Sequence, residues 1–218
     1  RGARRAGTAG ATAKVILGLQ AAGANGRCGA GVDLLARLNR FRRGGRYGRT
    51  AFDQALAVLA LRSIGHRVPS AARRVLLRSR GRGGWSFTLS GARRDDVGST
   101  GLVLQALRAS GVSRRHGTLR AGLRWLRAQR AAGGGFGQER RDRNEANPTA
   151  IALLAQRAMG VRDTRAVRAL RALQRSGGAF QFTATDAGSR VLATIDAVLA
   201  LSGRSQPVNA RRSPARGC

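Results

Sequence analysis

The chain of 218 residues is poor in the side chains from which most catalytic and metal sites are built. It contains two cysteines, Cys28 and Cys218, and two histidines, His66 and His116, with no CxxC or HxxxH spacing. A catalytic zinc ion needs at least three protein ligands, so we expect no metal site and no cofactor. Two cysteines also do not make a disulfide framework, and we expect both to be free.

Long apolar runs and lysine are equally scarce. The longest uncharged apolar stretches, such as residues 55–61, are far too short to cross a bilayer, so no transmembrane segment is predicted. Of the 41 basic residues only Lys14 is a lysine, which together with abundant alanine and glycine is typical of a genome rich in G and C.

The basic residues still dominate the charge. The formal net charge is +31 and the isoelectric point is near 12.0, values that would ordinarily indicate nucleic-acid binding. The arginines are spread along the chain, however, and no RRM, zinc-finger or helix-turn-helix pattern accompanies them. We therefore expect no specific nucleic-acid partner. Nonspecific affinity for polyanions is expected, and anionic lipid or acidic envelope polymers would serve equally well.

The chain does contain an internal repeat. An apolar segment headed by threonine or glutamine recurs at intervals of 42, 46, 49 and 45 residues. The heads are Thr12, Gln54, Thr100, Thr149 and Thr194. A repeat of this length normally means one supersecondary unit that is stacked on its neighbours. The aligned octapeptides carry only Lys14 and Asp196 as charges, so these helices are predicted to be buried.

A second set of segments alternates with the first. Arginine recurs every few positions in residues 69–80, 113–130 and 163–175, with apolar residues at helical spacing between. We therefore predict an all-α protein of two layers. The inner helices are predicted at 12–22, 50–64, 98–110, 148–159 and 188–202. The outer helices are predicted at 31–41, 69–80, 116–130 and 163–175.

Each outer segment is followed by a glycine cluster and an aromatic residue. Glycine supplies the positive φ that ends a helix and reverses the chain. The aromatic residues of these turns are Tyr47, Trp85, Phe136 and Phe180. At a fixed repeat position they are predicted to pack between adjacent outer helices. Stacking on a ligand is the alternative, and it keeps these four residues among the candidate binding residues.

Several segments resemble a known family. QRAAGGGF at 129–136, which follows LRWLRA, resembles the Gln-Trp repeat of squalene and terpene cyclases, with phenylalanine in place of tryptophan. QRSGGAF at 174–180 is a shorter version. RRDDVGSTGLVLQALRASG and NEANPTAIALLAQRAMG are similar to the prenyltransferase and squalene-oxidase repeats of actinobacterial proteins. The resemblance covers residues 6–203.

The resemblance implies an α/α toroid, in which outer helices surround a ring of inner helices and a central cavity. The family's full ring has about six hairpins, whereas about five repeats are present here and the chain begins at Arg1. We therefore expect an incomplete ring over residues 1–204 that lacks an N-terminal piece. The polar stretch 205–218 is expected to be a disordered basic tail.

The acid motif of class II terpene cyclases is degenerate in this chain. The family motif Asp-x-Asp-Asp-Thr has its nearest matches at 96–100 and 145–149, where Gly98 and Asn147 occupy the position of the proton donor. Neither residue can act as a general acid. Asp96 and Glu145 align with the first acid. The zinc ligands of protein prenyltransferases are absent as well, and only Phe52 among the aromatic residues stands beside an inner helix. No catalytic residue is assigned.

Most acidic residues stand in or just after the loops that lead into inner helices. They are Asp53, Asp95, Asp96, Glu139, Asp142, Glu145 and Asp186. Helix capping explains this placement, because carboxylates favour helix N-termini. The alternative is a polar rim that meets a partner, since loops on one face of a repeat protein often bind. Lys14 and Asp196 occupy the same aligned position in the first and last inner helices, and we predict an ion pair between them if the ring closes.

Three classes of function are compatible with these features. We favour a noncatalytic repeat domain that is exported or associated with the cell envelope and binds an apolar or envelope ligand. A terpenoid cyclase or prenyltransferase acting on an isoprenoid is the first alternative, and a structural repeat protein is the second. The candidate rim or cavity residues are Asp53, Asp95, Asp96, Glu145, Asn147, Asp186, Asp196 and the four turn aromatics.

Overall fold

The computed structural model describes residues 6–90, 94–138 and 143–208, and it is a mostly helical protein with little sheet. The apolar helices are α2 (Ala9–Ala21), α4 (Ala51–Ser63), α6 (Val97–Ala109), α8 (Ala146–Ala158) and α10 (Arg190–Leu201). The arginine-rich helices are α3 (Leu34–Arg40), α5 (Ser70–Arg78), α7 (Gly117–Ala128) and α9 (Thr164–Arg171). The all-α prediction is confirmed, and each helix lies within a few residues of its expected position.

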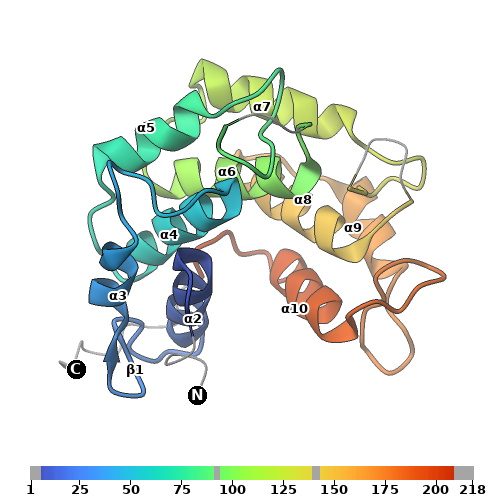
Figure 1. The fold of residues 1–218 in the computed structure, drawn as a ribbon. Helices are drawn as coiled ribbons and strands as arrows, with labels where there is room; N and C mark the ends of the chain where they lie inside the picture. The colour runs from blue at the N-terminus through green and yellow to red at the C-terminus, as the bar shows by residue number, and fades with distance from the viewer. Residues whose placement is uncertain (1–5, 91–93, 139–142, 209–218) are drawn as a thin grey trace.

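The helices form two layers along an arc (Figure 1). Each apolar helix packs against the apolar helix of the next repeat, in the order α2, α4, α6, α8 and α10, and the arginine-rich helices lie on the outside. Helices α2 and α10 stand at the two ends of the arc. The inner helices α4, α6 and α8 are buried nearly all round, whereas α5, α7 and α9 each bury a single stripe.

A short hairpin departs from the all-helical prediction. Strand β1 (Cys28–Gly29) pairs antiparallel with β2 (Val32–Asp33) just before α3. The two connecting residues, Ala30 and Gly31, have φ values of 53° and 72°. Positive φ at both central positions matches the twist of two paired strands, so this turn favours a hairpin.

The repeat threonines anchor the turns that precede their own helices. The backbone N–H of Trp85 donates to the Thr100 hydroxyl at 2.8 Å. Phe136 donates to Thr149 and Phe180 to Thr194 in the same way, each at 2.9 Å. In the second repeat the side-chain oxygen of Gln54 accepts from the N–H of Tyr47 at 2.8 Å. We call these four hydrogen bonds the turn anchors. They explain why a polar residue heads four of the five apolar helices, whereas in α2 the hydroxyl of Thr12 donates to the carbonyl of Thr8 at 2.9 Å.

The turn anchor of Trp85 holds a ring that lies between two outer helices. Its indole N–H donates to the carbonyl of Leu76 in α5 at 2.7 Å. Its ring also lies against Gly122 of α7, where an added Cβ would come within 2.5 Å of the indole. Trp85 thus fills the junction between α5 and α7, and the predicted packing role of the turn aromatic is confirmed for this repeat.

Helix α10 is an exception to the burial predicted for the inner layer. Val191, Leu192, Ile195 and Val198 are between 56% and 69% exposed. In α2, α4, α6 and α8 the positions equivalent to Ile195 are Ala13, Ala55, Gly101 and Ala150, and all are buried. Gly101 lies against Ile151 of the following inner helix. Helix α10 therefore exposes the face with which the other inner helices contact the next repeat, and no described helix covers it.

Replacing Thr100 by valine should destabilise the protein by about 1–3 kcal/mol, because the buried N–H of Trp85 loses its acceptor. Chemical denaturation measures the change. Thr100→Ser keeps the hydroxyl and is the matched control, so it should lose clearly less. A loss in Thr100→Ser with little or none in Thr100→Val would show that packing of the methyl group, and not the turn anchor, matters at this position.

Candidate functional site

The four turn aromatics are buried, so they are not candidate binding residues. Tyr47, Trp85, Phe136 and Phe180 are at most 2% exposed. Burial raises the pKa of Tyr47, although the nearby charge of Arg42 opposes the shift. The guanidinium of Arg130 lies 5.0 Å from the ring centre of Phe136, which is a contact within the fold. These rings are core residues and offer no face to a ligand.

The candidate carboxylates bind backbone N–H groups at the starts of helices and turns. Asp53 accepts from the N–H of Gly10 at 3.0 Å and so joins the starts of α2 and α4. Asp95 accepts from Gly83 and Gly84 in the glycine turn, at 3.0 and 2.9 Å. Asp96 is the N-cap of α6 and accepts from Ser99 at 2.7 Å. The capping interpretation is confirmed for Asp53 and Asp96, which bind N–H groups at helix starts, whereas Asp95 binds a turn.

The remaining carboxylates of the predicted rim follow the same rule. Glu145 is the N-cap residue of α8 and accepts from the N–H of Gln138 at 3.2 Å. Asp186 accepts from the N–H of Gly188 at 2.8 Å within its own turn. Glu139 and Asp142 lie outside the described residues. The rim carboxylates that the structure describes therefore hold the local backbone and do not converge on a common point.

Asp196 is the exception, because it bonds a side chain of the neighbouring inner helix. Its carboxylate accepts from the amide of Asn147 in α8 at 2.7 Å. Burial raises the pKa of Asp196, and the hydrogen bond from Asn147 and the charge of Lys14 only partly offset this shift. The predicted ion pair between Lys14 and Asp196 is not formed among the described residues. The amide of Asn147 is the direct partner, because α8 packs on α10 whereas α2 lies across the opening of the arc.

Gly98, which occupies the proton-donor position of the first motif that resembles the family motif, lies against an aromatic ring. A Cβ added to Gly98 would lie 3.3 Å from the ring of Phe52 and 3.5 Å from a carboxylate oxygen of Asp96. Phe52 packs in turn against Phe87, with ring centres 5.7 Å apart. Burial raises the pKa of Asp96, and the charge of Asp95 acts in the same direction, against the hydrogen bonds from Ser99.

A partly buried ion pair joins the third and fourth repeats. Arg130, at the end of α7, binds the carboxylate of Asp163, the N-cap of α9. Gln156 of α8 donates to the same carboxylate at 2.9 Å. Burial alone would raise the pKa of Asp163, but the hydrogen bonds from Arg130, Ala166 and Gln156 and the charge of Arg130 together lower it.

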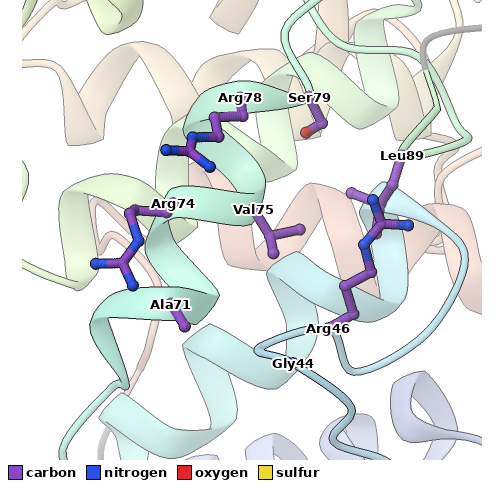
Figure 2. A pocket seen from close by; sticks show the side chains of 8 residues that line it. All are labelled: Gly44, Arg46, Ala71, Arg74, Val75, Arg78, Ser79 and Leu89. Carbon is purple, nitrogen blue, oxygen red and sulfur yellow. The ribbon is translucent and has the colours of Figure 1, made fainter.

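A pocket lined by three arginines lies on the outer layer, and none of the predicted site residues lines it (Figure 2). It has a volume of about 330 Å³ and lies between α5 and the turn that contains Gly44. Arg46, Arg74 and Arg78 line it, together with Ala71, Val75, Ser79 and Leu89. No carboxylate is among the lining residues. Sequence reasoning missed this pocket, because arginines on outer helices were read as ordinary surface.

A second pocket, of about 530 Å³, lies where α8 ends and α9 begins. Two arginines, Arg157 and Arg162, and the carboxylate of Asp163 line it, and Arg157 and Asp163 are already bound within the fold. Arg157 donates to the carbonyls of Ala200 and Arg204, at 2.8 and 3.3 Å, and Asp163 is paired with Arg130. The pocket beside α5 is therefore the better candidate for a charged ligand.

Cys28 corrects one expectation from the sequence. It is disulfide-bonded, not free, and Cys218 lies outside the described residues. Within residues 6–90, 94–138 and 143–208, no three His, Cys, Asp or Glu side chains are grouped so that they could hold a metal ion. In the same part of the chain, the helices are too short or too polar to span a membrane.

Comparison with known proteins adds no assignment. No protein-family model matches the chain, and no curated protein matches it.

Asp163 and Asp196 should have opposite effects on stability as the pH changes. The pKa of Asp163 is lowered by folding, so its ionised form stabilises the protein above pH ~4, and this contribution is lost as the pH falls through the folded pKa. The pKa of Asp196 is raised, so its ionisation destabilises the protein as the pH rises from ~4 through the folded pKa.

The two asparagine variants test these signs. Asp163→Asn keeps a capping side chain and should lose about 1–3 kcal/mol of stability at pH 7, with the difference shrinking in acid. Asp196→Asn should become more stable, relative to the unaltered protein, as the pH rises from acid to neutral. Urea denaturation at several pH values measures both, and the same sign of pH dependence in the two variants would contradict the assignment.

Proposed function

We propose that this protein is a noncatalytic repeat domain of the α/α toroid type, which binds an anionic partner of the cell envelope through its arginine-rich outer layer. The observation that carries the proposal is the use of the carboxylates. Only 10 acidic residues stand against 41 basic ones, and the described carboxylates are engaged by helix caps, turns, Asn147 and Arg130. Exposed arginines of α5 and α7 consequently have no acidic partner within the described part of the chain and remain available to an external anion.

The shape of the arc supports the toroid part of the proposal. Five inner helices follow one another with the same faces in contact, and α10 ends the series with a large apolar face exposed. Helix α2 exposes Lys14 at the position where α4, α6 and α8 have Leu56, Leu102 and Ile151. The two end helices thus expose complementary faces of one repeating contact, as expected of an incomplete ring.

The acid positions support a noncatalytic role. Gly98 carries no side chain and faces the ring of Phe52, and the amide of Asn147 is bound to Asp196. Export is supported by the disulfide at Cys28, because disulfides persist in oxidising compartments and are rare in the reducing cytosol.

The protein should bind vesicles of phosphatidylcholine mixed with phosphatidylglycerol, and it should be retained on heparin. If about four to six charges are neutralised, the affinity should fall on the order of a hundredfold or more between about 50 and 200 mM salt, because counterions are released. Vesicle co-sedimentation and salt elution measure this dependence. Pure phosphatidylcholine vesicles are the control, and equal binding to both vesicle types would contradict an anionic partner.

A terpenoid cyclase or prenyltransferase activity is the second candidate, and Asp196 is the observation that favours it. A half-buried carboxylate with a raised pKa is a possible general acid. Its bond to Asn147 weighs against this role, and so does the lack of a second convergent carboxylate among the residues that the structure describes.

We therefore expect the purified protein to form no cyclised product from squalene and to transfer no prenyl group, as measured by gas chromatography and by incorporation of labelled isoprenoid. A product that disappears in Asp196→Asn would replace the proposed function by the enzymatic one. The same product from Asp196→Asn and from the unaltered protein would indicate a contaminating enzyme.

A further inference from the structure

The pocket beside α5 has one wall on a helix and one on a tight turn. The helical wall carries Arg74 and Arg78, one turn of helix apart, on one side of Val75 (Figure 2). Arg46 stands on the other side, next to Leu89. It belongs to a turn closed by two hydrogen bonds of 2.8 Å between the backbones of Arg43 and Arg46.

Buried contacts hold the two walls together. The side-chain amide of Gln54, which is fully buried, donates to the carbonyl of Gly45 at 2.9 Å and to that of Ala72 in α5 at 3.0 Å. The turn also approaches α5 so closely that a Cβ on Gly45 would lie 2.7 Å from the Cβ of Ala71. Gly45 has a φ of 92°. Gln54, which stands where three other repeats have an anchoring threonine, therefore fixes the position of Arg46 relative to α5.

The lining of the pocket suits one ligand chemistry. Three guanidinium groups form no ion pair among the described residues, and arginine binds phosphate through two parallel N–H donors. The hydroxyl of Ser79 donates to the carbonyl of Leu76 at 3.1 Å, so its oxygen remains only as an acceptor. Ala71, Val75 and Leu89 add an apolar floor. The combination favours an anion attached to a small apolar body.

We propose that this pocket binds the phosphate group of a phosphate ester, with Arg46, Arg74 and Arg78 as donors and Val75 and Leu89 against the apolar part of the ligand. The proposal rests on the proposed anionic partner and names the phosphate as the group recognised. The phosphate could belong to a free ester or to a lipid headgroup, and the two sources share this chemistry.

The test compares two triple variants of the full chain. Arg46→Gln, Arg74→Gln and Arg78→Gln together remove the donors of the pocket. Arg120→Gln, Arg124→Gln and Arg127→Gln remove three exposed arginines from α7, so the two proteins have the same net charge. Binding of phenyl phosphate is measured by calorimetry at constant ionic strength, and far-UV circular dichroism checks the fold.

The pocket variant should bind phenyl phosphate about tenfold or more weakly than the unaltered protein, because each charged hydrogen bond contributes on the order of a factor of ten. The α7 variant should change by less than about twofold, since long-range charge is screened by salt. Equal losses in the two variants would overturn the proposed site. Replacing Arg46, Arg74 and Arg78 by lysine keeps the charge, and unchanged affinity in that variant would also overturn a site shaped for guanidinium groups.

Vesicles of phosphatidylcholine with phosphatidic acid separate the two sources of phosphate. Vesicle binding lost only in the pocket variant identifies a lipid headgroup. Vesicle binding equal in both variants, with phenyl phosphate binding lost only in the pocket variant, identifies a free ester. If the pocket variant and the α7 variant bind vesicles equally and also bind phenyl phosphate equally, the proposal is overturned.

Heparin retention, measured in parallel, separates the site from the proposed function. Retention in every variant without a pocket-specific phosphate loss would leave the proposed function standing and remove the site. Phosphate binding at the pocket in a protein that heparin does not retain would support the site and contradict the wider proposal.

Discussion

The architecture depends on one recurring hydrogen bond, between a buried polar side chain at the head of an inner helix and the backbone N–H of the aromatic residue in the preceding turn. Removing a buried acceptor leaves an unpaired N–H, so the bond strongly favours one turn geometry. The geometry of the turn then fixes the position of the aromatic ring. For Trp85, that position lies between the outer helices α5 and α7. A single polar position per repeat thereby links the inner layer, the turn and the outer layer.

The small number of carboxylates also determines the distribution of charge over the surface. Capping and turn bonds use the few carboxylates close to the backbone, where they satisfy N–H groups at helix starts. The arginines of the outer layer consequently have few internal partners, and the outer surface is strongly positive. The second repeat has glutamine, and not threonine, at the anchoring position. Gln54 is longer than threonine, so it reaches both the turn and α5 and holds Arg46 opposite Arg74 and Arg78.

The helices could be predicted because repeat period, helical spacing and glycine clusters are local signals. The roles of Asp53 and Asp96 at helix starts could be predicted as capping for the same reason, whereas the bonds of Asp95 to the glycine turn could not. The β1–β2 hairpin was missed, because it depends on positive φ at Ala30, a conformation that alanine rarely adopts. The bond of Asp196 to Asn147, in place of Lys14, depends on which helices are neighbours at the open end of the arc.

The sequence by itself determined the helices, their order, the division into an apolar and an arginine-rich set, and the buried role of the turn aromatics, because burial and periodicity are written into each repeat. Only the tertiary structure decided which faces of α2 and α10 stay uncovered, the disulfide state of Cys28, and the pocket that Arg46 lines together with two arginines of α5. These features join residues from different repeats, and the distance between such residues depends on how the layers pack.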